Sequence, residues 1–222
     1  MSAVEVLSGP PDCRLEEDNL GPFCWDGGRA DFTPLRLSLG AGAHFRYFIY
    51  VPPAEGIFQR AVEIDLSGPG AVVEVYGLIT GSADRPISLD ISLRHSASDT
   101  HSLCKLHSIG GERADLSLVG RVTVPNGALR CSSTLQNRNL RLSPTAQLRA
   151  IPILDIGAPD ARCSHGVTVG EPDRQQLFYM RSRGLEESRA IKLLRDAFAE
   201  EIVRHFPKNF QKLLPEEELA KD

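Results

Sequence analysis

The sequence predicts a mainly β protein that ends in a small helical region. Three observations point to this fold. Between about residues 35 and 156 the chain consists of segments in which apolar and polar side chains alternate, which is the pattern of half-buried strands. No stretch with helical spacing separates these segments. After Gly170 the apolar residues recur every three or four positions, as they do in amphipathic helices.

The strand segments are rich in valine, isoleucine and leucine, and glycine, proline, asparagine or short polar stretches separate them. In order they are AVVEVYGLIT, ISLDISLRHS, HSLCKLHSIG, ADLSLVGRVTV and LRLSPTAQLRAIPILDI. Such a series forms a sandwich, a barrel or a solenoid of stacked coils. Only PNGA, at Pro125–Ala128, has the Asn-Gly chemistry of a tight hairpin turn. This scarcity of hairpin turns favours stacked coils.

Two helices are expected after the strands. Asp173 can cap the first helix, and Gly184 is placed to end it as a left-handed residue. The second helix is expected to begin near Leu185 and to end at Pro207. Its continuous apolar face is formed by Ile191, Leu194, Phe198 and Ile202.

These patterns divide the chain into three regions. We expect an irregular N-terminal segment over residues 1–34, a β core over 35–170, and a C-terminal helical domain with its tail over 171–222. The acidic tail PEEELAKD is expected to fray.

The composition is that of a globular protein with a sizeable core. Of 222 residues, 41% are hydrophobic and 24% are charged, and the net charge is −4. The negative balance argues against non-specific binding to nucleic acid or to an anionic membrane. No apolar run approaches the roughly 18 residues of a membrane span, and the N-terminus lacks the pattern of a signal peptide. Five scattered cysteines without a C-x-x-C pair predict a reduced, cytoplasmic protein.

Cys163 and His165 are the most suggestive pair of reactive side chains. On a strand they would share one face, where they could supply half of a metal site or pair a thiol with a base. The alternative is a partly buried cysteine that behaves as a small hydrophobic residue. His101 and His107 would also share a face, but about 20 Å of extended chain would separate them, which suits no single metal ion.

The first expected helix carries residue types that are enriched at protein interfaces. Its sequence interleaves Phe178 and Tyr179 with Arg181 and Arg183. The aromatic side chains could bind a partner or cover the open end of the β core, and both roles are compatible. The chain has no nucleophile elbow and no P-loop, so an enzyme is not predicted.

A long stretch of this sequence is similar to a known family. CSHGVTVGEPDRQQLFYMRSRGLEESRAIKLLRDAF resembles the C-terminal signature of the SufB/SufD family of iron–sulfur cluster assembly scaffolds. LQNRNLRLSPTAQLRAIPILDI, SLRHSASDTHS and LVGRVTV are similar to other segments of that family. The resemblance is strongest over about residues 87–206 and is closer to the SufD side, whose members carry Cys-Ser-His-Gly.

The resemblance implies a right-handed parallel β-helix followed by a helical domain. It also implies a scaffold subunit that is not an enzyme and carries, at most, a transient iron–sulfur cluster. The implied partners are a SufC-type ABC ATPase, bound by the C-terminal helices, and a SufB-like subunit or a second copy, bound by the last rungs. The residues expected to bind the ATPase are Leu177, Phe178, Tyr179, Arg181, Arg183, Gly184 and Phe198.

Two positions of the expected interface rung depart from the family pattern. Ala146 stands where SufB-type chains have a sulfur-accepting cysteine, and Arg149 stands where SufB- and SufD-type chains have a histidine. Arginine stays protonated and cannot coordinate iron, so the cluster-building role is not expected at this position. The resemblance implies that Arg149 and Pro152 lie in the interface rung. Two alternatives remain open: Cys163 and His165 bind a metal or a cluster across a dimer interface, or the chain is a paralogue that no longer assembles clusters.

Overall fold

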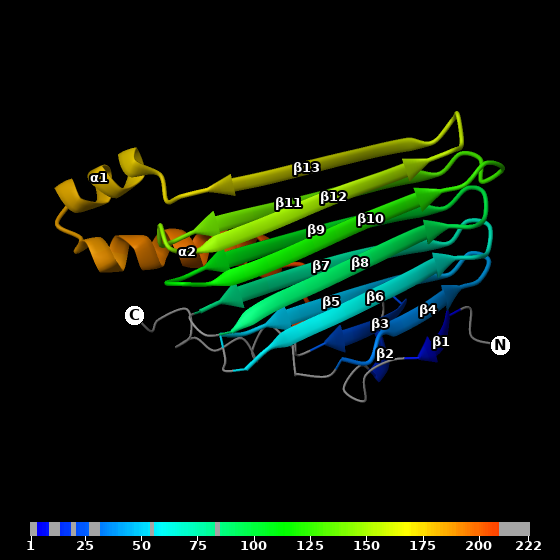
Figure 1. Ribbon diagram of the computed structural model, residues 1–222, viewed down its shortest axis with the longest axis horizontal. Helices are drawn as coiled ribbons and strands as arrows, with labels where there is room; N and C mark the ends of the chain where they lie inside the picture. The colour runs from blue at the N-terminus through cyan, green and yellow to red at the C-terminus, as the bar shows by residue number, and fades with distance from the viewer. Residues whose placement is uncertain are drawn as a thin grey trace.

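The structure is a computed structural model that describes residues 4–8, 14–18, 21–26, 32–53, 56–82 and 85–208. The strands stack into a solenoid in which the chain alternates between two facing sheets (Figure 1). Within each sheet, strands of successive coils pair in parallel. The predicted mainly β fold of stacked coils is therefore confirmed.

Within the described residues, six strands form the first sheet and seven form the second. In spatial order the first sheet contains β1 (Val4–Ser8), β4 (Leu35–Leu39), β6 (Phe58–Leu66), β8 (Pro86–His95), β10 (Asp115–Val124) and β12 (Gln147–Ile156). The second contains β13 (Arg162–Gly170), β11 (Ser132–Arg141), β9 (His101–Gly110), β7 (Val72–Gly81), β5 (His44–Val51), β3 (Gly21–Asp26) and β2 (Arg14–Asp18).

The described parts of the N-terminal segment form strands, whereas the sequence predicts an irregular segment over residues 1–34. They include β1, which pairs antiparallel with β4, and an antiparallel pair formed by β2 and β3. β3 in turn continues the second sheet in parallel with β5. The first coil offers unpaired backbone groups at its edges, and pairing with these short strands supplies hydrogen-bond partners that the local sequence pattern does not reveal.

The main core lies between the two sheets. Side chains that point inward from successive strands form rows of valine, isoleucine, leucine and phenylalanine, and nearly all are fully buried. Close packing leaves little room at Gly77, where an added Cβ atom would lie 2.7 Å from Leu106 and 2.8 Å from Ile49. The apolar alternation read from the sequence therefore marks the inner face of each strand.

A buried polar cluster interrupts this core near the end of β8. The two ring nitrogens of His95 form hydrogen bonds with the hydroxyl groups of Thr100, at 2.8 Å, and Ser102, at 2.9 Å. The Ser102 hydroxyl also bonds that of Ser133 on the next coil, at 2.7 Å. Burial, assisted by nearby His101, lowers the pKa of His95 to about 4. The neutral imidazole is thus the form that the folded protein favours.

His95 should make the protein less stable as the pH falls. In the unfolded chain the imidazole has a pKa of 6.5, so that state gains a proton before the folded state does. The stabilising contribution of neutral His95 is complete above pH 6.5, the pKa in the unfolded chain, and it is lost as the pH falls towards about 4, the pKa in the folded protein. Between about pH 7.5 and pH 5.5 the loss in unfolding free energy should be about 1 kcal/mol.

Urea denaturation of wild type and of His95→Gln at these two pH values measures this contribution. Glutamine keeps a donor and an acceptor but does not titrate, so the variant should lose less stability on acidification than wild type does. His165→Gln, at an exposed position, serves as the control and should keep the wild-type dependence. Equal pH dependence in His95→Gln and wild type would contradict the prediction.

Two helices follow the solenoid, α1 (Arg174–Ser182) and α2 (Glu187–Val203). The predicted cap of α1 is confirmed, because the Asp173 carboxylate accepts hydrogen bonds from the backbone N–H groups of Gln175 and Gln176. Gly184, predicted to follow α1 in a left-handed conformation, has φ +88°. Among the described residues, no helix is long and apolar enough to cross a membrane.

α2 packs against the outer face of the second sheet. The Phe198 ring stacks on His107, with 4.6 Å between the ring centroids, and the Phe198 carbonyl accepts a hydrogen bond from Nδ1 of His107. An ion pair joins Glu201 to Arg138 on β11. The second apolar cluster, which this packing creates, contains Phe48, Tyr50, Tyr76, Leu78, Ile109, Leu140, Ala199, Ile202, Val203 and Phe206.

Candidate docking site

The last coil of the solenoid is open at its end. β12 and β13 are the terminal strands of their sheets, so each pairs with another strand on one side only. The inner row of β10 is buried, whereas the row that continues it on β12 is only partly buried. That partly covered row consists of Leu148, Ala150, Pro152 and Leu154. Among the residues that the structure describes, no further coil covers the apolar face of this last coil.

Cys163 and His165 lie on the inner face of β13, at this open end. They pair in register with Ser133 and Leu135 of β11, which are both buried. One coil later Cys163 is partly buried and His165 is exposed. The predicted shared face is therefore present, and it is the face on which a metal site or an interface was expected.

The environment of Cys163 is that of a small apolar residue. Its side chain packs against a cluster that contains Val122, Cys131 and Ala158. Burial, with a smaller contribution from Cys131, raises the pKa of the Cys163 thiol, which disfavours the thiolate needed to bind a metal. Among the described residues, no group of three or more His, Cys, Asp or Glu side chains could hold a metal ion.

Pro152 occupies the inner row of β12. One coil earlier the residue at this position is Gly120, where an added Cβ atom would lie 2.7 Å from the Leu135 side chain. Pro152 and His165 pair in register with Gly120 and Leu135, so they occupy the equivalent positions of the last coil.

Arg149 points to the outer face of the same strand. Its guanidinium donates hydrogen bonds to the Asp115 carboxylate, at 2.5 Å, and to the Gln147 side chain, at 3.2 Å. The Arg149 charge is therefore paired on the outer face of the first sheet. Of Arg149 and Pro152, which were both expected at the interface, only Pro152 lies on the inner face at the open end of the solenoid.

α1 is a nine-residue helix in which no residue is buried. The Phe178 and Tyr179 side chains are 74% and 59% exposed. The Arg183 guanidinium lies over the Tyr179 ring, 5.4 Å from its centroid. A helix of this length is marginally stable alone in water, because few hydrogen bonds offset the cost of nucleation. An uncovered helix with large exposed aromatic residues is typical of a surface that binds another protein.

Five of the predicted docking residues lie on α1 or at its end, and Gly184 terminates the helix. Leu177 is partly covered, and Arg181 forms an ion pair with Glu187 at 2.9 Å, which ties α1 to the start of α2. Phe198 lies elsewhere: it contacts His107, and Arg138 lies 5.3 Å from its ring centroid. The Phe198 ring thus anchors α2 to the sheet, and we do not include it in the docking surface.

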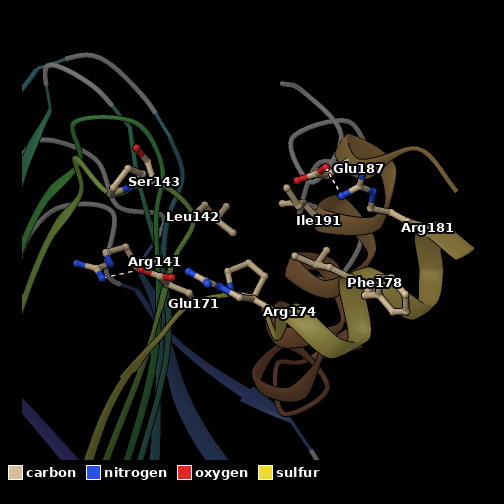
Figure 2. A pocket seen from close by; sticks show the side chains of 12 residues that line it. Arg141, Leu142, Ser143, Glu171, Arg174, Phe178, Arg181, Glu187 and Ile191 are labelled. Atoms are coloured by element: carbon tan, nitrogen blue, oxygen red, sulfur yellow. Dashed lines mark hydrogen bonds and ion pairs between the residues drawn. The ribbon is translucent and has the colours of Figure 1, made fainter.

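A pocket of about 600 Å³ lies between the helices and the turn that follows β11 (Figure 2). α1 and α2 form one wall, and Arg141–Pro144 with Glu171 and Pro172 form the other. Arg141 and Glu171 form an ion pair at 2.7 Å. Sequence reasoning missed Arg141, Glu171 and Arg174, because residues 30 or more positions apart become neighbours only through the stacking of coils.

Comparisons with known proteins agree on one family. The family described as "SUF system FeS cluster assembly, SufBD core domain" matches residues 24–198. An iron–sulfur cluster assembly SufBD family protein of Synechocystis is 37% identical over 132 residues, which cover 54% of this chain and 29% of the relative. The iron–sulfur cluster assembly protein SufD of Escherichia coli is 27% identical over 146 residues, which cover 66% of this chain and 34% of the relative. The chain thus spans about a third of the length of the curated relatives it matches.

Proposed function

Because this chain belongs to the SufBD core family of the SUF system for iron–sulfur cluster assembly, we propose that it is a non-enzymatic scaffold subunit whose helix α1 docks a SufC-type ABC ATPase. The observation that carries this proposal is that α1 has no buried residue yet exposes Phe178 and Tyr179. We place the protein in the cytoplasm, where the free thiols of its described cysteines would stay reduced.

The contacts of the two helices could transmit a movement of the bound ATPase to the solenoid. α1 is joined to α2 by the ion pair between Arg181 and Glu187. α2 is in turn fixed to the second sheet through Phe198, His107 and the pair between Glu201 and Arg138. A movement of the bound ATPase would therefore pass through α2 to the coils on which the cluster is assembled.

Co-expression with the SufC-type ATPase of the same genome tests the docking proposal. We expect the two proteins to co-elute as a complex in size-exclusion chromatography. An ATPase that elutes separately from this chain, at concentrations of both proteins well above the micromolar range, would contradict it.

We further propose that the open end of the solenoid pairs with a SufB-like subunit or with a second copy of the chain. The apolar row of the last coil and the unpaired edges of β12 and β13 support this assignment. Val169, which pairs in register with the buried Asn139, lies on the inner face of β13 and is 52% exposed. A charged side chain there should oppose pairing with little effect on the fold.

Val169→Glu should weaken this pairing at least about tenfold, because it places an unpaired charge against an apolar face. Analytical ultracentrifugation of the chain alone and with a SufB-like subunit measures the effect. Thr168→Glu adds the same charge to the outer face of the same strand and should leave pairing near the wild-type level. If both variants pair as wild type does, the open end is not the interface.

A second candidate function is the binding of a metal or a cluster by Cys163 and His165 across that interface. Their shared inner face at the open end favours it, because a partner could add further ligands there. Iron, zinc and sulfide analysis of the anaerobically purified complex, with Cys163→Ser as the comparison, tests it. Equal metal content in the variant and the wild type would contradict a role for Cys163.

A further inference from the structure

The pocket beside α1 is lined by one more arginine than glutamate, so one of its positive charges has no carboxylate partner in the pocket. Three arginines and two glutamates line it. Arg141 is paired with Glu171, and Arg181 is paired with Glu187. For Arg174, among the residues that the structure describes, there is no carboxylate within ion-pair distance. Figure 2 shows its guanidinium extending from α1 towards the side of the pocket where Arg141 and Glu171 lie.

Arg174 is the first residue of α1, directly after the residue that caps the helix. The Asp173 carboxylate accepts hydrogen bonds from the backbone N–H groups of Gln175 and Gln176, so it already balances the positive end of the helix dipole. A carboxylate that entered the pocket would therefore be attracted by the Arg174 guanidinium.

Apart from Ser143, the remaining walls of the pocket are apolar. They are formed by side chains of Leu142, Pro144, Pro172, Leu177, Phe178 and Ile191. An occupant that fills this space must combine a carboxylate with adjacent apolar groups, as an aspartate or glutamate beside an aliphatic or aromatic residue does.

We propose that the partner bound by α1 inserts an acidic side chain, flanked by an apolar residue, into this pocket and pairs it with Arg174. The pocket is continuous with the proposed docking surface, because Leu177 and Phe178 belong to both. The inference rests on the proposed docking of a SufC-type ATPase and adds the chemistry of the contact. Arg174 acts as the specificity residue of the docking site, and the exposed aromatic residues of α1 supply its apolar contacts.

Isothermal titration calorimetry with the SufC-type ATPase tests the role of Arg174. Arg174→Glu should weaken binding at least about tenfold, because the reversed charge repels the incoming carboxylate. Arg174→Lys should lose less affinity for the ATPase than Arg174→Glu does, because lysine keeps the positive charge, although it cannot form the bidentate contact of an arginine. The matched control is Arg189→Glu, an exposed arginine of α2 outside the pocket, which should bind within about twofold of wild type.

Two further measurements identify the occupant. Wild-type affinity should fall more steeply with added salt than the affinity of Arg174→Glu, because that variant lacks the attractive ion pair. Replacing the matching acidic residue of the ATPase with lysine should restore binding to Arg174→Glu.

The outcomes separate this inference from the docking proposal. If wild type and Arg174→Glu bind the ATPase equally, docking stands and the role of Arg174 is overturned. If wild type does not bind the ATPase, both proposals fail. If Arg174→Glu instead abolishes self-association in ultracentrifugation and leaves ATPase binding intact, the pocket belongs to a second copy of the chain, and this inference is overturned.

Discussion

Replacing Phe178 and Tyr179 together with alanine is expected to abolish capture of the SufC-type ATPase while the protein stays folded. Aromatic residues that anchor an interface each contribute about 2 kcal/mol or more, so the double variant should bind at least about a hundredfold more weakly. Both side chains are mostly exposed and α1 contains no buried residue. The unfolding free energy should therefore change by no more than about 0.5 kcal/mol.

Co-elution and calorimetry measure the loss of ATPase affinity, and thermal unfolding measures whether the double variant keeps the wild-type stability. Phe32→Ala is the matched control, because Phe32 is 60% exposed and precedes β4, far along the solenoid from α1. That variant should bind the ATPase as wild type does. A double variant with unchanged affinity would show that the ATPase binds elsewhere, and one that unfolds would show that these rings support the fold.

Phe206→Ala is expected to detach α2 from the sheet while the solenoid remains folded. Phe206 is 2% exposed, and its ring meets that of Phe48 edge to face, with 5.6 Å between the centroids. Removing a buried phenylalanine side chain costs about 3 kcal/mol or more, because it leaves a cavity. Local opening of α2 should therefore become about a hundredfold more frequent.

Native-state hydrogen exchange resolves this effect element by element. In Phe206→Ala the amides of α2 should exchange faster, whereas those of β8 and β10, which lie in the opposite sheet, should keep their protection. We expect the ATPase still to bind α1, with its movements no longer passed to the coils. Equal acceleration in α2 and β10 would show instead that helix and solenoid unfold as one unit.

The strands that the sequence predicts well are those with an apolar inner row. β8 and β10 alternate cleanly because their inner residues pack in the main core and their outer residues are less buried. β7 and β9 alternate only in their first halves, because α2 covers outer residues of their second halves. β11 escapes this pattern, since its inner row includes Asn137 and Asn139. The Asn139 side chain accepts a hydrogen bond from Ser108 on the previous coil and donates one to the Thr168 carbonyl on the next. Such partners are unknown until the coils are stacked.

The candidate site also contains residues that the sequence marks and residues that only the stacking of coils brings together. The residues of α1 are visible in the sequence because aromatic and arginine residues are interleaved within one helix. The pocket is not visible, because its walls come from separate coils. Arg141 bonds Glu171 across 30 positions, as Arg130 bonds Asp99 across 31. Helical spacing also marked Phe198 as part of an apolar face, but it does not distinguish a face that covers a sheet from one that receives a partner.

The position of α2 has a mechanical consequence. In a solenoid each coil touches only its immediate neighbours, so a pull on the last coil would peel coils away one by one. α2 and the turn after it contact β5 through Phe48, β7 through Tyr76, β9 through His107 and β11 through Arg138. The helix therefore distributes a load among four successive coils. A force applied at α1 is resisted by the body of the solenoid through α2, as well as by the open end through β13, which precedes α1 in the chain.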